Sequence, residues 1–216
     1  MYQTLKQDLV SGAFALGDPL NANDLAEALG TSRQPVMDAL KRLQGEGLVD
    51  ILPQIGCQVA MPTAADVEDF YEVFATLEGL ITSMAARRRP DAAVERLVAL
   101  AESLPTVATG DRVQDNRRYA EANRSFHGAV HELAASPEAR RAAEFYWDRS
   151  DFLIASLRPP FWQGAPEVAH HEHKAIARFV GAREAEPARL SASEHIRRFG
   201  TEVAARLRAG AAQGEP

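Results

Sequence analysis

The chain has little cysteine, no long apolar run and no excess of basic charge. Its single cysteine, Cys57, excludes a disulfide within the chain and is typical of a protein in a reducing cytoplasm. No apolar run approaches the ~20 residues needed to cross a bilayer, and the N-terminal segment lacks the basic start and apolar core of a signal peptide. We therefore expect a cytoplasmic protein with no membrane partner.

The charge balance argues against a generic nucleic-acid binder. The net charge is −6, and residues 1–61 alone contain four basic and seven acidic side chains. Proteins that bind nucleic acid usually concentrate basic charge on the binding face. The apolar fraction of 46% and the charged fraction of 25% are ordinary for a globular protein with a buried core. Any DNA binding must therefore depend on a few clustered cations.

The stretch from Ala26 to Val59 has the pattern of two short helices, a tight turn and a β-hairpin. Asn23 is the expected N-cap of the first of these helices and Ser32 that of the second, with Pro35 in the first turn, where proline is tolerated. This order predicts a winged helix-turn-helix, whose usual purpose is to place one helix end in a DNA major groove. The expected helices span 2–11, 24–29 and 33 to Gly45 or Gly47, and the expected strands span 48–52 and 57–61.

The start of the second helix carries the candidate base-reading side chains. Arg33 can bind guanine in a bidentate manner, and Gln34 can do the same with adenine. The remaining candidates are polar or basic groups placed for phosphates, together with a glycine at the tip of the wing. A winged fold used for protein contacts is the alternative. The candidate DNA-binding residues are Thr31, Ser32, Arg33, Gln34, Lys41, Arg42 and Gly56.

Everything after Pro62 and Thr63 has helical periodicity. Breaks at proline and glycine divide it into about six amphipathic helices, which predicts an antiparallel bundle. The expected fold is mainly α, with an N-terminal winged helix-turn-helix over 1–62, a helical domain over 63–210 and a disordered tail over 211–216. The expected helices span 64–88, 91–104, 113–135, 137–156, 166–182 and 187–208.

All six histidines lie in the helical region. The apolar spacing places His127, His173 and His195 on the inward faces of three helices, and His131 at the edge of its helix's apolar stripe. Buried imidazoles without partners are costly, and a shared metal ion would remove that cost. The alternative is three separate buried histidines, each bonded to its own neighbour. Periodicity alone leaves both open.

Several short runs of the N-terminal region agree in order and spacing with one known pattern: Leu25-Ala26, Ser32-Arg33, Pro35-Val36, Ala39-Leu40, Arg42-Leu43, Glu46 to Val49, and Gly56. With these residues the region resembles the DNA-binding domain of the GntR family of bacterial regulators over about residues 5–60. The family often has an arginine at the position of Met37 and a basic wing residue at Gln54 or Ile55. Both departures remove phosphate contacts, so the resemblance implies DNA binding that is weak or confined to an unusual site.

The helical region has a second set of runs in a recognisable order: Asp66-Val67, Leu77-Glu78, Ala122 to Arg124, Phe126-His127, Glu172 to Ile176, and His195. With these residues the region resembles the FCD effector domain of FadR-like GntR regulators over about residues 65–208. The resemblance implies that Asn123, His127, His173 and His195 hold a divalent metal, with zinc or nickel favoured, and that the metal receives a small carboxylate effector.

Two substitutions modify that expectation. Asn123 stands where aspartate is common, so it offers an amide oxygen without charge and lowers metal affinity. Phe74 stands where the family often has an arginine, which favours a less acidic, bulkier or more apolar effector. Phe74 and Glu78 are the candidate effector-pocket residues. For Glu78 the favoured interpretation is a buried carboxylate paired with an arginine from another helix.

The sequence therefore predicts a ligand-responsive transcription repressor, not an enzyme. It would bind an operator as a homodimer, because two half-sites are read by two copies. The alternative is a metal-dependent enzyme or metal-binding protein on the three-histidine bundle, for which Glu172 is the only candidate general base. A third hypothesis is a regulator that has lost the metal and whose histidines contact the effector directly.

Overall fold

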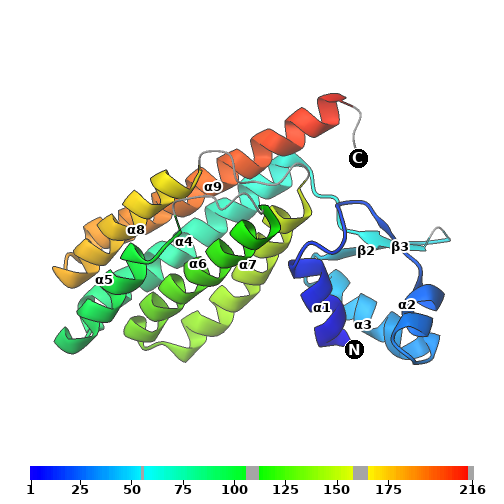
Figure 1. Ribbon diagram of the computed structural model, residues 1–216, viewed down its shortest axis with the longest axis horizontal. Helices are drawn as coiled ribbons and strands as arrows, with labels where there is room; N and C mark the ends of the chain where they lie inside the picture. Colours follow the sequence, from blue (N-terminus) through cyan, green and yellow to red (C-terminus); the bar gives the residue numbers. More distant parts are fainter. Residues whose placement is uncertain (55, 106–111, 158–164, 214–216) are drawn as a thin grey trace. The chain divides into compact units, whose positions relative to one another are not determined.

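The computed structural model describes residues 1–54, 56–105, 112–157 and 165–213 (Figure 1). Contacts divide the chain into two compact units. We call them the winged unit (Met1–Asp66, Phe145–Phe161 and Val203–Pro216) and the helical unit (Val67–Glu144 and Trp162–Glu202). Three long helices contribute residues to both units, so the boundary runs within helices as well as between them.

The N-terminal part of the winged unit is a helix-turn-helix followed by a small antiparallel sheet (Figure 1). The strands have the order β1-β3-β2, with Ile51 paired to Cys57 and Leu20 also paired to Cys57 on the other side of β3. Apolar side chains from all three helices and from the strands form its core. The elements are α1 (Tyr2–Val10), β1 (Pro19–Leu20), α2 (Ala22–Ala28), α3 (Arg33–Gly45), β2 (Val49–Leu52) and β3 (Gly56–Val59).

Two local predictions in this region were wrong. The N-cap of α2 is Asn21 and not Asn23, because the Asn21 Oδ1 accepts a hydrogen bond from the Asn23 backbone N–H at 2.9 Å. The expected strands, 48–52 and 57–61, also left out Pro19 and Leu20, which form the edge strand β1. A strand of two residues is too short to show the alternation of apolar and polar residues by which strands are recognised. Proline is tolerated there because β1 is an edge strand.

The sequence left open whether α3 ends at Gly45 or at Gly47, and the backbone hydrogen bonds at its C-terminus show where it ends. The N–H of Gly47 donates to the Gln44 carbonyl at 3.0 Å, and the N–H of Leu48 donates to the Leu43 carbonyl at 3.0 Å. Gly47 has a left-handed φ of 71°, so this is the Schellman pattern of helix termination. The helix therefore ends at Gly45, and Gly47 turns the chain into β2.

The rest of the described chain is helical, as expected from its periodicity. A 3₁₀ turn, η1 (Asp91–Ala93), precedes the fifth helix after Pro90, and the last helix continues five residues beyond the expected end at 208. Most of the expected breaks between 104 and 113 and between 156 and 166, and residues 214–216 of the expected tail, lie outside the described residues. The helices are α4 (Ala64–Arg88), α5 (Val94–Glu102), α6 (Arg112–Ala134), α7 (Pro137–Ser156), α8 (Ala165–Gly181) and α9 (Ala185–Gln213).

Small residues bring α4 and α9 close together in the helical unit. The Ser193 hydroxyl donates to the Ala75 carbonyl at 2.9 Å, and a side chain added at Gly79 would collide with Ser193. Gly200 lies against the ring of Tyr71 in the same way. This packing fixes the part of α9 that carries His195. No helix in the described ranges is both long and apolar enough to cross a bilayer.

Candidate functional sites

Three histidines from three helices of the helical unit meet at one point. His127 lies on α6, His173 on α8 and His195 on α9, and each residue is at most 2% exposed. The Nε2 of His173 lies 3.1 Å from the Nε2 of His127 and 3.1 Å from the Nε2 of His195. One ligand nitrogen from each ring lies within 4.8 Å of the other two. The three inward-facing histidines therefore meet, which is one of the two arrangements that periodicity alone left open.

Glu172 and Arg198 hold the ring of His195 from behind. The Glu172 Oε2 lies 2.6 Å from the His195 Nδ1, and Arg198 donates to both Glu172 oxygens at 2.7 Å. Burial raises the pKa of Glu172, but the hydrogen bonds from His195 and Arg198 outweigh it and lower that pKa to about 2. Glu172 is therefore ionised at neutral pH, which favours a proton on the Nδ1 of His195.

Glu78 lies near the Nδ1 of His127, as Glu172 lies near the Nδ1 of His195. Its fully buried carboxylate contacts the His131 Nε2 at 2.8 Å and lies 3.4 Å from the His127 Nδ1. Burial raises the Glu78 pKa, but the two rings together hold it well below its usual value. We expected an arginine as its partner, and the structure instead shows two histidines from α6. His131, placed at the edge of the apolar stripe by its spacing, is buried against this carboxylate.

The protons available cannot satisfy the three Nε2 atoms by hydrogen bonding alone. Burial lowers the pKa of His127 to about 4, and burial reinforced by the other two rings lowers that of His173 well below its usual value, so both are neutral at pH 7. A neutral imidazole carries one proton. With the protons of His127 and His195 on Nδ1, facing carboxylates, the Nε2 of His173 has two contacts and at most one proton. At least one contact then brings two lone pairs together.

A shared cation removes that conflict. Two nitrogens bound tetrahedrally to one zinc ion at about 2.0–2.1 Å lie about 3.3 Å apart, close to the 3.1 Å separations. Carboxylates behind ligating histidines are the usual supporting groups of such sites. Asn123 lies one turn before His127 on α6, and its Oδ1 is buried with no hydrogen-bond partner in the described part of the chain. The donor set therefore suits a divalent transition metal.

The structure places the remaining effector-pocket candidate in the core. Phe74 is fully buried, and its ring lies 6.0 Å from that of Phe70 and 6.3 Å from that of Tyr71.

Glu172 is the candidate general base of the enzyme hypothesis. Its two carboxylate oxygens contact His195 and Arg198. A carboxylate held in this way is placed to position the ring of His195.

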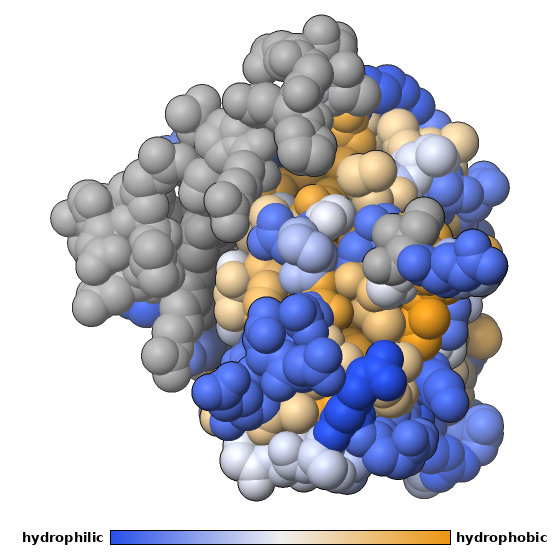
Figure 2. Space-filling view, turned by 90° about the vertical axis from the view of Figure 1, so that its right-hand side faces the viewer, coloured by the Kyte–Doolittle hydropathy of each residue, from blue (hydrophilic) through white to orange (hydrophobic). Residues whose placement is uncertain are grey.

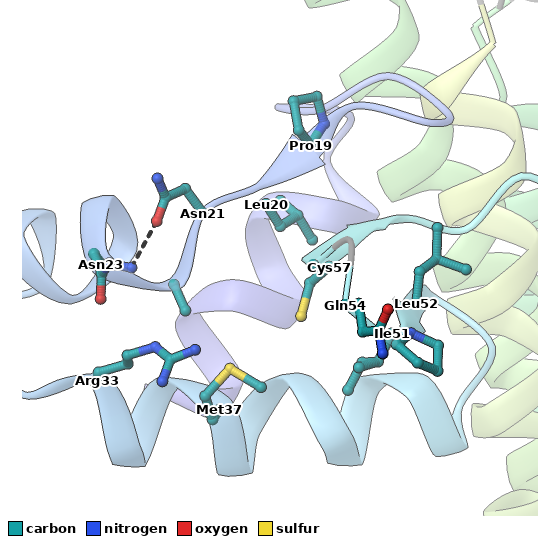
Figure 3. Close-up of a pocket in the computed structure, with 13 residues that line it drawn as sticks. Pro19, Leu20, Asn21, Asn23, Arg33, Met37, Ile51, Leu52, Gln54 and Cys57 are labelled. Carbon is teal, nitrogen blue, oxygen red and sulfur yellow. Dashed lines mark hydrogen bonds between the residues drawn. The ribbon is translucent and has the colours of Figure 1, made fainter.

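The second candidate site is an open concavity of about 680 Å³ between α2, α3 and the wing. Arg33 and Gly56 from the predicted DNA-binding set line it (Figure 3). Figure 2, which turns the right-hand side of Figure 1 toward the viewer, shows apolar residues at the surface among hydrophilic ones on that side of the molecule. Our sequence reasoning missed Asn21, Asn23 and Met37 as lining residues; the four-residue spacing of Arg33 and Met37 was the available signal.

The other predicted DNA-binding residues have varied surroundings. The Gln34 Nε2 donates to the Asp38 Oδ1 at 3.0 Å, and the Arg42 guanidinium lies 3.8 Å from the centre of the Tyr2 ring. Lys41 is exposed. Ser32 is the N-cap of α3, as expected, although its side chain makes no capping hydrogen bond, and Thr31 precedes it at the turn.

Comparisons with known proteins identify a family for each of the two regions of the chain. Residues 1–59 match the family described as "Bacterial regulatory proteins, gntR family", and residues 69–198 match the FCD domain. An HTH-type transcriptional regulator from the TAR-I ttuE-ttuC' intergenic region of Agrobacterium vitis is 31% identical over 134 residues, which cover 62% of this chain and 78% of the relative. A "Probable D-xylose utilization operon transcriptional repressor" of Paenarthrobacter nicotinovorans is 25% identical over 88% of this chain and 80% of its own length.

A solved structure shares the fold. The E. coli protein McbR/YncC superimposes with a TM-score of 0.70 at 20% identity, covering 91% of this chain and 92% of that chain. These relatives are transcriptional regulators and not enzymes. Since the FCD match alone covers more than half of the sequence, the chain belongs to the GntR family of bacterial transcriptional regulators, with an FCD domain as its helical part.

Proposed function

We propose that the chain is a metal-dependent, effector-responsive repressor that binds its operator as a homodimer in the cytoplasm. Residues 1–62 form the DNA-binding domain and residues 63–210 the effector domain in this proposal. The convergence of three buried Nε2 atoms carries it, because their protons cannot satisfy all the contacts. The name of the Paenarthrobacter nicotinovorans relative, a repressor of an operon, supports repression rather than activation.

In the proposed site, His127, His173 and His195 hold the ion through Nε2, and the Asn123 amide oxygen is the fourth protein ligand. When bound, the ion supplies a Lewis acid that accepts the oxygens of a small carboxylate effector. Glu172 and Glu78 keep two rings in the tautomer that directs a lone pair inward. Because Asn123 is neutral, the site holds one negative charge fewer than an aspartate site, so metal affinity is lower. Nitrogen ligands favour zinc or nickel.

On the DNA side, Arg33 reads a base edge, and Thr31, Ser32, Lys41, Arg42 and Gly56 supply backbone contacts. The Gln34–Asp38 hydrogen bond places a carboxylate beside the reading face, where it repels phosphate. Each phosphate that a cation neutralises releases about one counterion, which steepens the fall of log affinity with log salt concentration by about one unit. Because this domain has few cations, its affinity should depend only weakly on salt. The effector changes DNA affinity by the difference in its own affinity for the free and DNA-bound conformations.

The direct test measures DNA binding and metal content on the same full-length preparation. Fluorescence anisotropy with duplexes from upstream of the coding region should show saturable binding that weakens as salt increases. Elemental analysis of protein purified without chelator should find about one divalent ion per chain, and small carboxylates should shift the DNA titration only when the ion is present. Absence of salt-sensitive binding would contradict the DNA assignment. A metal-free protein that still responds to carboxylates would support direct effector contact by the histidines.

A further inference from the structure

Arg33 and Met37 lie one helical turn apart on α3 and line the same concavity (Figure 3). The opposite wall consists of Leu20 from β1, Ile51 from β2 and Cys57 from β3. The Cys57 thiol lies near enough to Arg33 for the guanidinium to lower its pKa, although burial has the larger, opposite effect and the pKa is raised. The two α3 side chains therefore present a cation and an apolar end to one open space.

The charge of this surface excludes a general phosphate-binding role. Arg33 carries the only charge among the lining residues that the structure describes, and the other polar ones are amides. An apolar side chain in a DNA interface gains nothing from phosphate, but it gains from burial against another apolar group. In the major groove, the C5-methyl of thymine is the apolar group that base edges present.

The spacing along α3 agrees with base reading by both side chains. An α-helix rises 1.5 Å per residue, so positions four apart are separated by about 6 Å along its axis. Base pairs are spaced by about 3.4 Å, so two such side chains reach bases one or two steps apart. Gln34 is on the neighbouring face of α3, and its amide donates to Asp38, which leaves Arg33 and Met37 as the pair aimed into the concavity.

We propose that Met37 is a specificity-determining residue that contacts the C5-methyl group of a thymine one or two base pairs from the guanine bound by Arg33. This inference rests on the proposed DNA binding and names what its recognition helix selects. Met37 thus replaces a phosphate contact by a base contact. The operator gains sequence selectivity at this position while total affinity depends less on salt.

The experiment separates the methyl group from every other feature of the base. Full-length protein is used to select bound duplexes from a random pool, and each thymine of the selected sequence is then replaced, one at a time, by deoxyuridine, which lacks only the methyl. We expect one thymine per half-site at which this change weakens binding about fourfold, the value of one buried methyl-sized group. With Met37→Ala or Met37→Gln, the same replacement should have no effect. Met61→Ala, at an exposed methionine outside the concavity, should retain the wild-type pattern.

The outcomes distinguish this inference from the function on which it rests. If duplexes are enriched but no thymine responds to loss of its methyl, or if the response persists in both Met37 variants, the inference is wrong and DNA binding stands. If no duplex is enriched, both are wrong. Circular dichroism of the two Met37 variants confirms that they fold, and two substitutions guard against an effect specific to one of them.

Discussion

The histidine cluster and the wing concavity differ in how their polar groups are satisfied. The rings of His127, His173 and His195 are almost completely buried, and two of them have a carboxylate behind Nδ1. The concavity is open, and water can satisfy Arg33 until DNA replaces it. An unsatisfied buried polar group costs about 1–3 kcal/mol, whereas an exposed one costs almost nothing. The polar groups of a buried site therefore need hydrogen-bond partners from the protein before the ligand binds, whereas those of an exposed site can bond to water.

The largest effect should follow from removing the central ring of the cluster. His173→Ala deletes the nitrogen that contacts both others, so divalent-metal affinity should fall by at least about 100-fold, beyond the 10–100-fold typical of supporting residues. Isothermal titration with zinc and elemental analysis measure this. His171→Ala, at an exposed neighbour on α8, is the matched control and should bind metal as the wild type does. Equal losses in both variants would mean that the cluster is not the metal site.

On the exposed side, Arg33→Ala should reduce affinity for the selected operator by about 5- to 150-fold, because a bidentate base contact is worth about 1–3 kcal/mol. Discrimination at the guanine should fall with it. Arg141→Ala, an exposed arginine of α7, removes the same charge elsewhere and should change affinity little. Anisotropy titrations against the operator and a guanine-substituted duplex give both quantities. An Arg33 variant with unchanged discrimination would refute the base-reading role.

A smaller effect should come from the carboxylate behind His195. Glu172→Gln keeps the shape but removes the charge that orients the ring and that Arg198 holds. We expect metal affinity to fall about 10-fold, the lower end of the range for supporting residues. Glu186→Gln, at an exposed glutamate of α9, serves as the control. If Glu172→Gln binds metal as tightly as the control, the carboxylate contributes only to packing.

The smallest effect concerns the turn that joins α3 to the wing. Gly47→Ala places a side chain at a φ of 71° and should lower the free energy of unfolding by about 1–2 kcal/mol. Gly45→Ala lies within the helix with open space around its added carbon, and should raise it by about 0.5 kcal/mol. Chemical denaturation of the two variants measures the contrast. Opposite signs are expected, and destabilisation of similar size in both would contradict the Schellman assignment.

Patterns within one element were the predictable part of this fold. The helix from Ala64 to Arg88 was predicted to the residue, because its apolar spacing and flanking residues are local signals. The N-cap of α2 was misplaced by two residues, since Asn21 and Asn23 are both good capping residues and only the backbone decides between them. The partner of Glu78 was wrong because the pairing joins two helices that periodicity describes separately.

The sequence by itself determined which faces of each helix are apolar, where the chain turns, and which histidines point inward, because each of these depends on residues a few positions apart. Only the tertiary structure decided that the three inward rings meet at Nε2, that Glu172 and Glu78 support two of them, and that Met37 shares a concavity with Arg33. These relations depend on the packing of separate elements against one another, and spacing along one element carries no information about the crossing of two.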